Sequence, residues 1–322
     1  MPRKIDISHK TVIFITLFIL GLWVIYLIRD LLIILFIAII LMSALEPLVI
    51  FFNRLKIPRA LGIAITYITI IAIVLGILAA ILPPLVEQSS RLIVSSPALL
   101  GQVSSFTNID KSVFQSEITS LSKNLFSVTL AAFDNFLTVI FLLVITFYLL
   151  LERRDLENRI SGLFIGNEDR SRQLMTKIQE KLGSWLRGQI FLSIVIGSLS
   201  YLGLVILNVP FALPLSLVAA IMEVVPVIGP IISAVPAIFV ALTISPILGV
   251  GVGVMYFIIQ QMENHFIVPQ VMKKAVGLNP LVVILTIAVG SRILGFSGAL
   301  LAVPIAVVLQ ILVTEVIEQR KV

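Results

Sequence analysis

Charged residues divide the chain into long stretches that contain no Asp, Glu, Lys or Arg. These stretches cover residues 11–28, 31–45, 60–86, 135–151, 188–222, 224–262 and 293–314. About 20 apolar helical residues cross the hydrocarbon core of a bilayer, which is about 30 Å thick. The stretches therefore predict transmembrane helices and an all-α polytopic membrane protein, rather than the core helices of a soluble domain.

The composition excludes several other classes of protein. Charged residues make up 12% of the chain, whereas a soluble domain carries about 25%. A soluble fold, a disordered chain and a broadly basic nucleic-acid-binding surface are therefore excluded. There are no cysteines and only two histidines, which excludes disulfides, thiolate ligands and a multi-histidine metal centre. The sequence has no Walker A loop and no His-Glu-x-x-His motif, so we expect no cofactor, no metal and no ATP-driven pump.

The predicted organisation has about eight membrane segments. Residues 11–28 and 31–52 are interpreted as a helical hairpin that turns at Arg29-Asp30. The full division is 1–86 as N-terminal transmembrane helices, 87–127 as an extracytoplasmic amphipathic helical segment, 128–151 as a transmembrane helix, 152–187 as a cytoplasmic basic amphipathic helical segment and 188–322 as a C-terminal transport core. The two amphipathic segments follow from apolar residues at helical spacing within polar sequence.

The distribution of basic residues sets the predicted orientation, because Lys and Arg are enriched in cytoplasmic loops. With a cytoplasmic N-terminus, 18 of the 23 basic residues fall on the cytoplasmic side and 5 on the other. We therefore expect both termini in the cytoplasm and residues 87–127 outside.

Two proline-bounded stretches in the C-terminal third resemble each other. Residues 210–236 contain Glu223 about midway, and residues 280–304 contain Arg292 about midway; a turn with proline or glycine follows each charge. One span separates the stretches, so they are expected to enter the membrane from opposite sides, as two Pro/Gly-broken hairpins of an inverted repeat. Such pairs mark the binding site of many transporters, because interrupted helices expose backbone polar groups that need partners. The alternative is ordinary proline kinks in two unrelated helices.

Ionisable residues within apolar spans are costly and indicate function. Glu223, Glu263 and Arg292 are of this kind, and Gln260 shares a helix face with Glu263 or Asn264. The candidate substrate or ion site is Glu223, Pro226, Gly229, Pro230, Gln260, Glu263, Asn264, Arg292, Gly295, Ser297 and Gly298. The alternative is that these polar groups only hold helices together.

The sequence Gly295-Phe296-Ser297-Gly298 also matches the Gly-x-Ser-Gly of rhomboid intramembrane proteases. A serine nucleophile needs a base, and the only candidate, His265, precedes the serine, whereas in rhomboids it follows. We therefore interpret these small residues as a tight turn with close helix packing, and we expect no catalytic residue and no enzyme.

The order of the motifs resembles the autoinducer-2 exporter family of PerM-like permeases over residues 185–310. The motifs are Leu207-Asn208-Val209-Pro210, Glu223 to Pro230, Gln260-Gln261-Met262-Glu263-Asn264, Leu278-Asn279-Pro280 and Leu294 to Pro304. The resemblance implies a multi-pass protein of a bacterial or archaeal inner (plasma) membrane, and a homo-oligomer such as a pentamer. Family members often carry Asp or Asn where Glu223 stands.

These observations predict a secondary transporter or permease, and the family resemblance implies that it exports a small polar solute. Its partners would be membrane lipid and either the solute or a monovalent cation or proton, with no nucleic acid. Arg292 and freed backbone N–H groups would hold a polar or anionic solute, whereas Glu223 and Glu263 would serve a cation or proton. The alternatives are a sodium (cation)/proton antiporter that uses the same residues, and a membrane scaffold or intramembrane enzyme without transport.

Overall fold

The computed structural model describes residues 9–103, 136–162, 168–226, 228–272 and 277–319. Every regular element in these ranges is a helix, and six helices are long and apolar enough to cross a membrane. They are Lys10–Leu27, Arg29–Arg54, Arg59–Ile81, Glu168–Ile206, Pro246–Met272 and Leu281–Glu318. Two shorter apolar helices accompany them. The all-α polytopic fold predicted from the charge-free stretches is confirmed.

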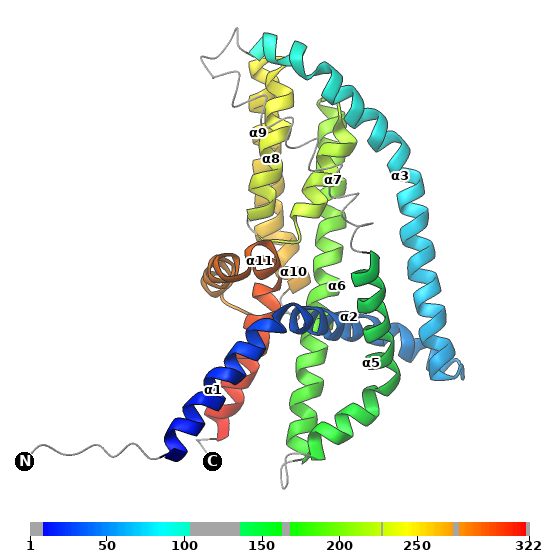
Figure 1. Ribbon diagram of the computed structural model, residues 1–322. Helices are drawn as coiled ribbons and strands as arrows, with labels where there is room; N and C mark the ends of the chain where they lie inside the picture. Colours follow the sequence, from blue (N-terminus) through cyan, green and yellow to red (C-terminus); the bar gives the residue numbers. More distant parts are fainter. Residues whose placement is uncertain (1–8, 104–135, 163–167, 227, 273–276, 320–322) are drawn as a thin grey trace, which may run out of the picture.

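The predicted hairpin at Arg29-Asp30 is wrong. Helix α1 (His9–Leu27) leads into α2 (Arg29–Arg54) with a bend, and the two helices diverge from Ile28 rather than fold side by side (Figure 1). The amides of Ile28 and Leu32 each donate to the carbonyl four residues earlier at 3.0 Å. A charged pair does not by itself break a helix, and neither Pro nor Gly stands here to do so. The residues of α1 are largely exposed, which leaves this apolar helix for lipid or a partner chain.

Two helices cross the predicted segment limits without a break. Helix α3 (Arg59–Val103) continues past residue 87, and α6 (Glu168–Ile206) continues through residue 187 into the apolar stretch that follows. A change in side-chain polarity along a helix changes the surroundings that the helix prefers, but it does not end the helix. Much of the 87–127 segment and the start of the 128–151 segment lie outside the described residues, and the side of the membrane on which each segment lies stays a prediction.

A buried carboxylate joins three helices near the end of α2. Glu46 on α2 forms ion pairs with Arg59 on α3 at 3.1 Å and with Arg153 on α5 (Phe136–Gly162) at 2.7 Å. The Arg59 Nε also donates to the carbonyl of Leu150 on α5 at 2.9 Å. Glu46 is 6% exposed, so its charge is compensated by these two guanidinium groups rather than by water.

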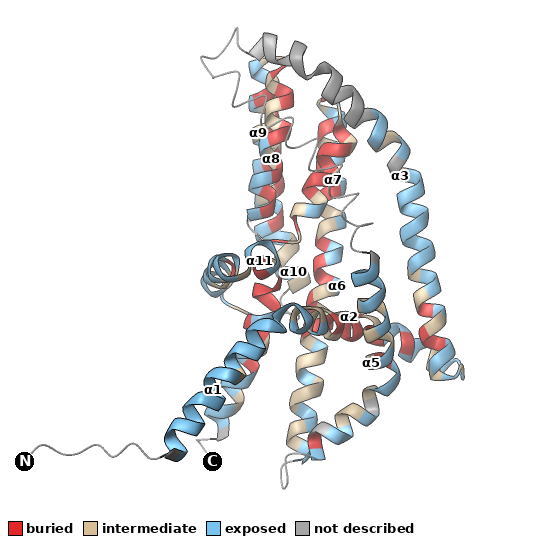
Figure 2. Cartoon of the chain, in the orientation of Figure 1, coloured by how far each residue is buried: buried red, intermediate tan, exposed pale blue. Residues whose placement is uncertain are grey.

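The first broken hairpin consists of α7 (Ala212–Met222) and α8 (Ile228–Leu242), which stand beside the second half of α6 together with α9 (Pro246–Met262) (Figure 1). Buried residues are concentrated on α7, α8 and the adjoining part of α6, whereas α1 and residues 71–80 of α3 are exposed (Figure 2). Apolar side chains from these helices form one cluster, which includes Leu204, Leu215, Ala219, Ala237 and Val252. The reversal between Met222 and Ile228 therefore lies against a packed bundle.

The second predicted interruption is also present. Helix α11 (Pro280–Gln319) is broken at Leu294 and Gly295, where the backbone leaves helical angles and Gly295 adopts φ 61°. Its two arms then pack together at two glycines: a Cβ on Gly290 would overlap the carbonyl of Gly298, and the converse also holds. A positive φ and a backbone-to-backbone crossing are both conditions that glycine meets most easily. The pseudo-two-fold relation between the two hairpins stays a prediction.

Candidate functional site

A cavity of about 610 Å³ lies where the turn between α7 and α8 meets α6, the segment that follows α9 (residues 263–272) and both arms of α11. Small-molecule sites are commonly about 300–1,000 Å³. Its polar lining comes from Gln189, Glu223, Glu263 and Asn264, with the indole of Trp185 beside them. The remaining lining residues are mostly apolar. A mainly apolar chamber with a few polar atoms can bind and orient a small solute.

Glu223 lies directly after α7, in the turn that the first broken hairpin makes. It is 1% exposed, and neither carboxylate oxygen has a hydrogen-bond partner among the described residues. The Gln189 side chain holds the turn from α6, because its Nε2 donates to the main-chain oxygen of Glu223 at 2.6 Å. Burying a charged carboxylate without partners is costly, so Glu223 would gain from a proton, a cation or a hydrogen-bond donor in the cavity.

Glu263 reaches the same cavity from the other side. It begins a π-helical turn, η1 (Glu263–Ile267), which joins α9 to α10 (Val268–Met272). The carboxylate is 2% exposed, and Gln260 Nε2 approaches Glu263 Oε2 at 3.4 Å and Asn264 Oδ1 at 3.5 Å. Single π-helical turns are rare and frequently lie at functional sites. Gln260, Glu263 and Asn264 therefore lie together as the helical spacing predicts, although Gln260 does not line the cavity.

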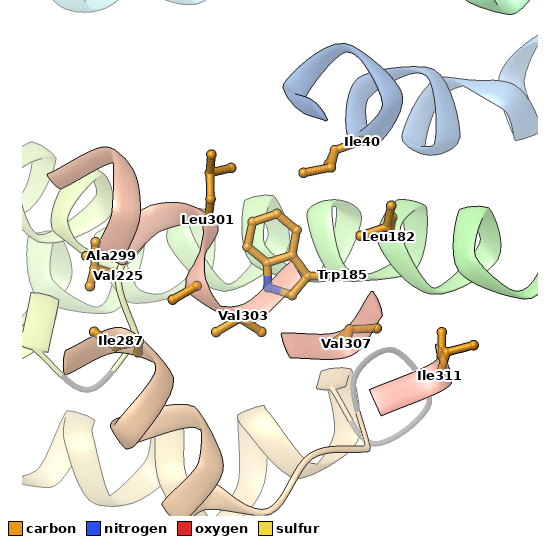
Figure 3. Packing of buried hydrophobic residues seen from close by; sticks show 11 residues of the cluster. Ile40, Leu182, Trp185, Val225, Ile287, Ala299, Leu301, Val303, Val307 and Ile311 are labelled. Carbon is orange, nitrogen blue, oxygen red and sulfur yellow. The ribbon is translucent and has the colours of Figure 1, made fainter. Parts of the chain in front are cut away.

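The sequence reasoning missed Trp185 and Gln189 as members of this site. Trp185 Nε1 and Gln189 Oε1 are buried without hydrogen-bond partners among the described residues. The indole ring of Trp185 packs in an apolar cluster with Leu301 and Val303 of α11 (Figure 3). The available signal was their spacing of four residues on one helix, which places an indole N–H and an amide on the same face.

The turn of the second hairpin does not reach this cavity. Arg292, Gly295 and Ser297 are exposed, and the second hairpin lines the cavity through residues of its arms, including Val283 and Val303. Any binding role of Arg292, Gly295 or Ser297 stays a prediction, and it would have to operate outside the described cavity.

The predicted residues of the first turn divide into two groups. Pro226 lines the cavity. Gly229 and Pro230 are buried and do not line it, and a Cβ on Gly229 would overlap the carbonyl of Met222 across the hairpin. Gly298 occupies the corresponding kind of position in the second hairpin, against Gly290. Both glycines therefore lie at helix crossings rather than at the cavity wall.

A solute-sized cavity beside two interrupted segments, among helices long enough to cross a membrane, is typical of polytopic membrane proteins of the transporter class. The family profile described as "AI-2E family transporter" matches residues 13–318. The chain belongs to this family, and the resemblance inferred from its motifs is confirmed.

Three relatives illustrate the extent of the similarity. The chain is 28% identical over 295 residues to the AI-2 transport protein TqsA of Escherichia coli, covering 86% of this chain and 82% of TqsA. It is 23% identical over 317 residues to PerM of the same species, provisionally named a permease, covering 90% and 88%. The match to YrrI of Bacillus subtilis, provisionally named a transport protein, is 29% over 151 residues and spans 43% of that protein.

Proposed function

We propose that this protein is a permease that exports a small polar solute through the cavity between Glu223 and Glu263. The observation that supports this function is the set of buried polar atoms without partners that border the cavity: both carboxylate oxygens of Glu223, Gln189 Oε1 and Trp185 Nε1. By analogy with TqsA, whose name gives AI-2 as its substrate, autoinducer-2 is the first solute to test.

The polar atoms also favour a chemical class of solute. Carboxylate and amide oxygens accept hydrogen bonds, and the indole N–H is the single orphaned donor among them. No Lys or Arg lies among the described residues that line the cavity. These features favour a neutral or cationic solute with several hydroxyl or amino groups over an anionic solute.

Flux through the purified protein in liposomes tests this function directly. We expect uptake of a neutral, hydroxyl-rich solute or of autoinducer-2 and little flux of anionic solutes. Trp185→Phe and Gln189→Leu should each lower flux about fivefold, the effect of one lost hydrogen bond worth about 1 kcal/mol. The matched control is Gln310→Leu, an exposed position away from the cavity. Equal flux in the control and the cavity variants would contradict the proposal.

Cation/proton antiport is a second candidate, favoured by the two buried carboxylates that line one cavity. A bound cation or added protons would stabilise such a pair of buried carboxylates most, because either one compensates the buried negative charge. Flux driven by a sodium or pH gradient, with no organic solute present, distinguishes this candidate from solute export. The intramembrane-protease alternative has no comparable support, since Ser297 is exposed and His265 Nδ1 contacts the carbonyl of Gln261 at 3.0 Å.

The proposed export direction requires the orientation predicted from the basic residues. Because the chain has no cysteine, single cysteines at Ser105 and Ser171 can be labelled with a membrane-impermeant maleimide in intact cells. We expect Ser105→Cys to react before lysis and Ser171→Cys only after it. Reaction of both positions from the same side would refute the proposed topology.

A further inference from the structure

A second cavity, of about 350 Å³, lies at the end of α2 that contacts α3 and α5. We call it the arginine pocket and define it by Glu46, Asn53, Arg54, Arg59 and Arg153, all of which line it. Glu157 and Ile50 complete its wall. It is separate from the cavity at Glu223, and no step of the proposed transport function uses it.

The arginine pocket lies where three apolar stretches end together. The stretch on α2 ends at Phe52, the stretch on α3 begins at Ala60, and the stretch on α5 ends at Leu151. The pocket's arginines stand just beyond these limits, at 54, 59 and 153. Three helices that leave the apolar region at one place mark the depth of the lipid headgroups. The fold therefore gathers the three arginines at the membrane surface.

Charge in the pocket is positive after its ion pairs are counted. Glu46 holds the guanidinium groups of Arg59 and Arg153, and Glu157 lies 3.1 Å from Arg153. Two carboxylates thus face three arginines. Arg54 is exposed, and no ion pair or hydrogen bond joins its side chain to a described residue. The ion pairs fix the orientation of two guanidinium groups, and Arg54 supplies a third that has no partner there.

This arrangement suits a phosphate group with an apolar attachment. Guanidinium groups present several N–H donors in a planar fork that matches phosphate oxygens. Beside the pocket, Ile50, Phe51 and Leu55 expose apolar side chains, with Phe51 and Leu55 each 58% exposed. A headgroup bound at Arg54 would therefore have its acyl chains beside apolar surface, whereas a free phosphate would gain nothing from these residues.

We propose that the arginine pocket is a binding site for the phosphate headgroup of an anionic phospholipid. Basic pockets between membrane helices have the charge needed for such headgroups. Glu46, Arg59 and Arg153 shape the site, and Arg54 is the residue that discriminates an anionic lipid from a zwitterionic one.

Native mass spectrometry of the detergent-purified full chain with added phosphatidylglycerol tests the site. The variant is Arg54→Gln, which removes an exposed charge without a described partner. The matched control is Arg159→Gln, which removes an exposed charge from α5 outside the pocket. We expect Arg54→Gln to weaken phosphatidylglycerol binding about fivefold, the equivalent of about 1 kcal/mol for one basic residue at a membrane surface. The control should bind as the unmodified protein does, and both variants should keep its thermal unfolding midpoint.

Two further probes separate the sources of phosphate. Phosphatidylcholine, which is zwitterionic, should bind more weakly than phosphatidylglycerol and should be insensitive to Arg54→Gln. Glycerol 3-phosphate, which lacks acyl chains, should fail to displace the lipid. Equal weakening by Arg54→Gln and Arg159→Gln, or displacement by glycerol 3-phosphate at the lipid's own concentration, would overturn the proposal.

Discussion

Replacing both Glu223 and Glu263 by glutamine is expected to reduce flux by at least about tenfold and to remove its dependence on pH. Hydrogen bonds to a charged group contribute about 1.5–3 kcal/mol, and about 1.4 kcal/mol corresponds to a factor of ten. Both carboxylates are buried at one cavity, and the Glu223 oxygens have no described partner to lose. Glutamine keeps the side-chain shape, so the folded yield should be retained.

The control for this double variant is Glu168→Gln with Glu318→Gln, two exposed carboxylates away from the cavity. Flux should be measured in liposomes across a series of pH values, alongside the folded yield from size-exclusion chromatography. A double variant at Glu223 and Glu263 with unchanged pH response would end the idea of proton coupling. Unchanged flux at every pH would show that the cavity is not the transport site.

Gly229→Val and Gly298→Val are expected to lower the folded yield severely, each destabilising the protein by about 3 kcal/mol. The new side chain at Gly229 would overlap the carbonyl of Met222, and that at Gly298 would overlap the carbonyl of Gly290. Backbone atoms cannot rotate away as a side chain can, so the hairpin arms would have to separate. The sequence hypothesis placed both glycines beside the substrate path; the geometry instead favours a role in packing.

Gly21→Val and Gly76→Val are the controls, because a Cβ at either position meets no atom within 4 Å. Folded yield and the thermal unfolding midpoint should be measured for all four variants, with flux normalised to folded protein. We expect the controls to match the unmodified protein in every measurement. A normal folded yield with lost flux in Gly229→Val or Gly298→Val would support the sequence hypothesis that these glycines lie beside the substrate path.

Apolar stretches and their interruptions were the part of the fold that sequence reasoning predicted well. Membrane helices need long apolar runs, and the reversals between Met222 and Ile228 and at Leu294-Gly295 follow from prolines, glycines and a central charge. The hairpin at Arg29-Asp30 failed because two charged residues remain compatible with helical backbone. A hydropathy pattern shows where a chain is apolar, but it does not show whether a polar position bends the helix or ends it.

The candidate site was predicted less completely, because tertiary packing decides which side chains face the cavity. Glu223, Glu263 and Asn264 do share a cavity, whereas Arg292 is exposed outside it. Both Glu223 and Arg292 are single charges in apolar sequence, and only the packing of neighbouring helices separates them. Gln189 was missed because it lies two residues after Arg187, at the end of the polar segment, where another polar residue does not stand out.

The crossing of Gly290 and Gly298 has a consequence for how this chain can vary over evolution. Each glycine contacts the backbone of the other, so a larger residue at either position cannot be accommodated by shrinking its neighbour, which is already the smallest residue. A larger residue at one of these positions therefore cannot be compensated by a smaller residue at the other. Divergence in the second hairpin must proceed through the side chains around this crossing, while the crossing itself stays fixed.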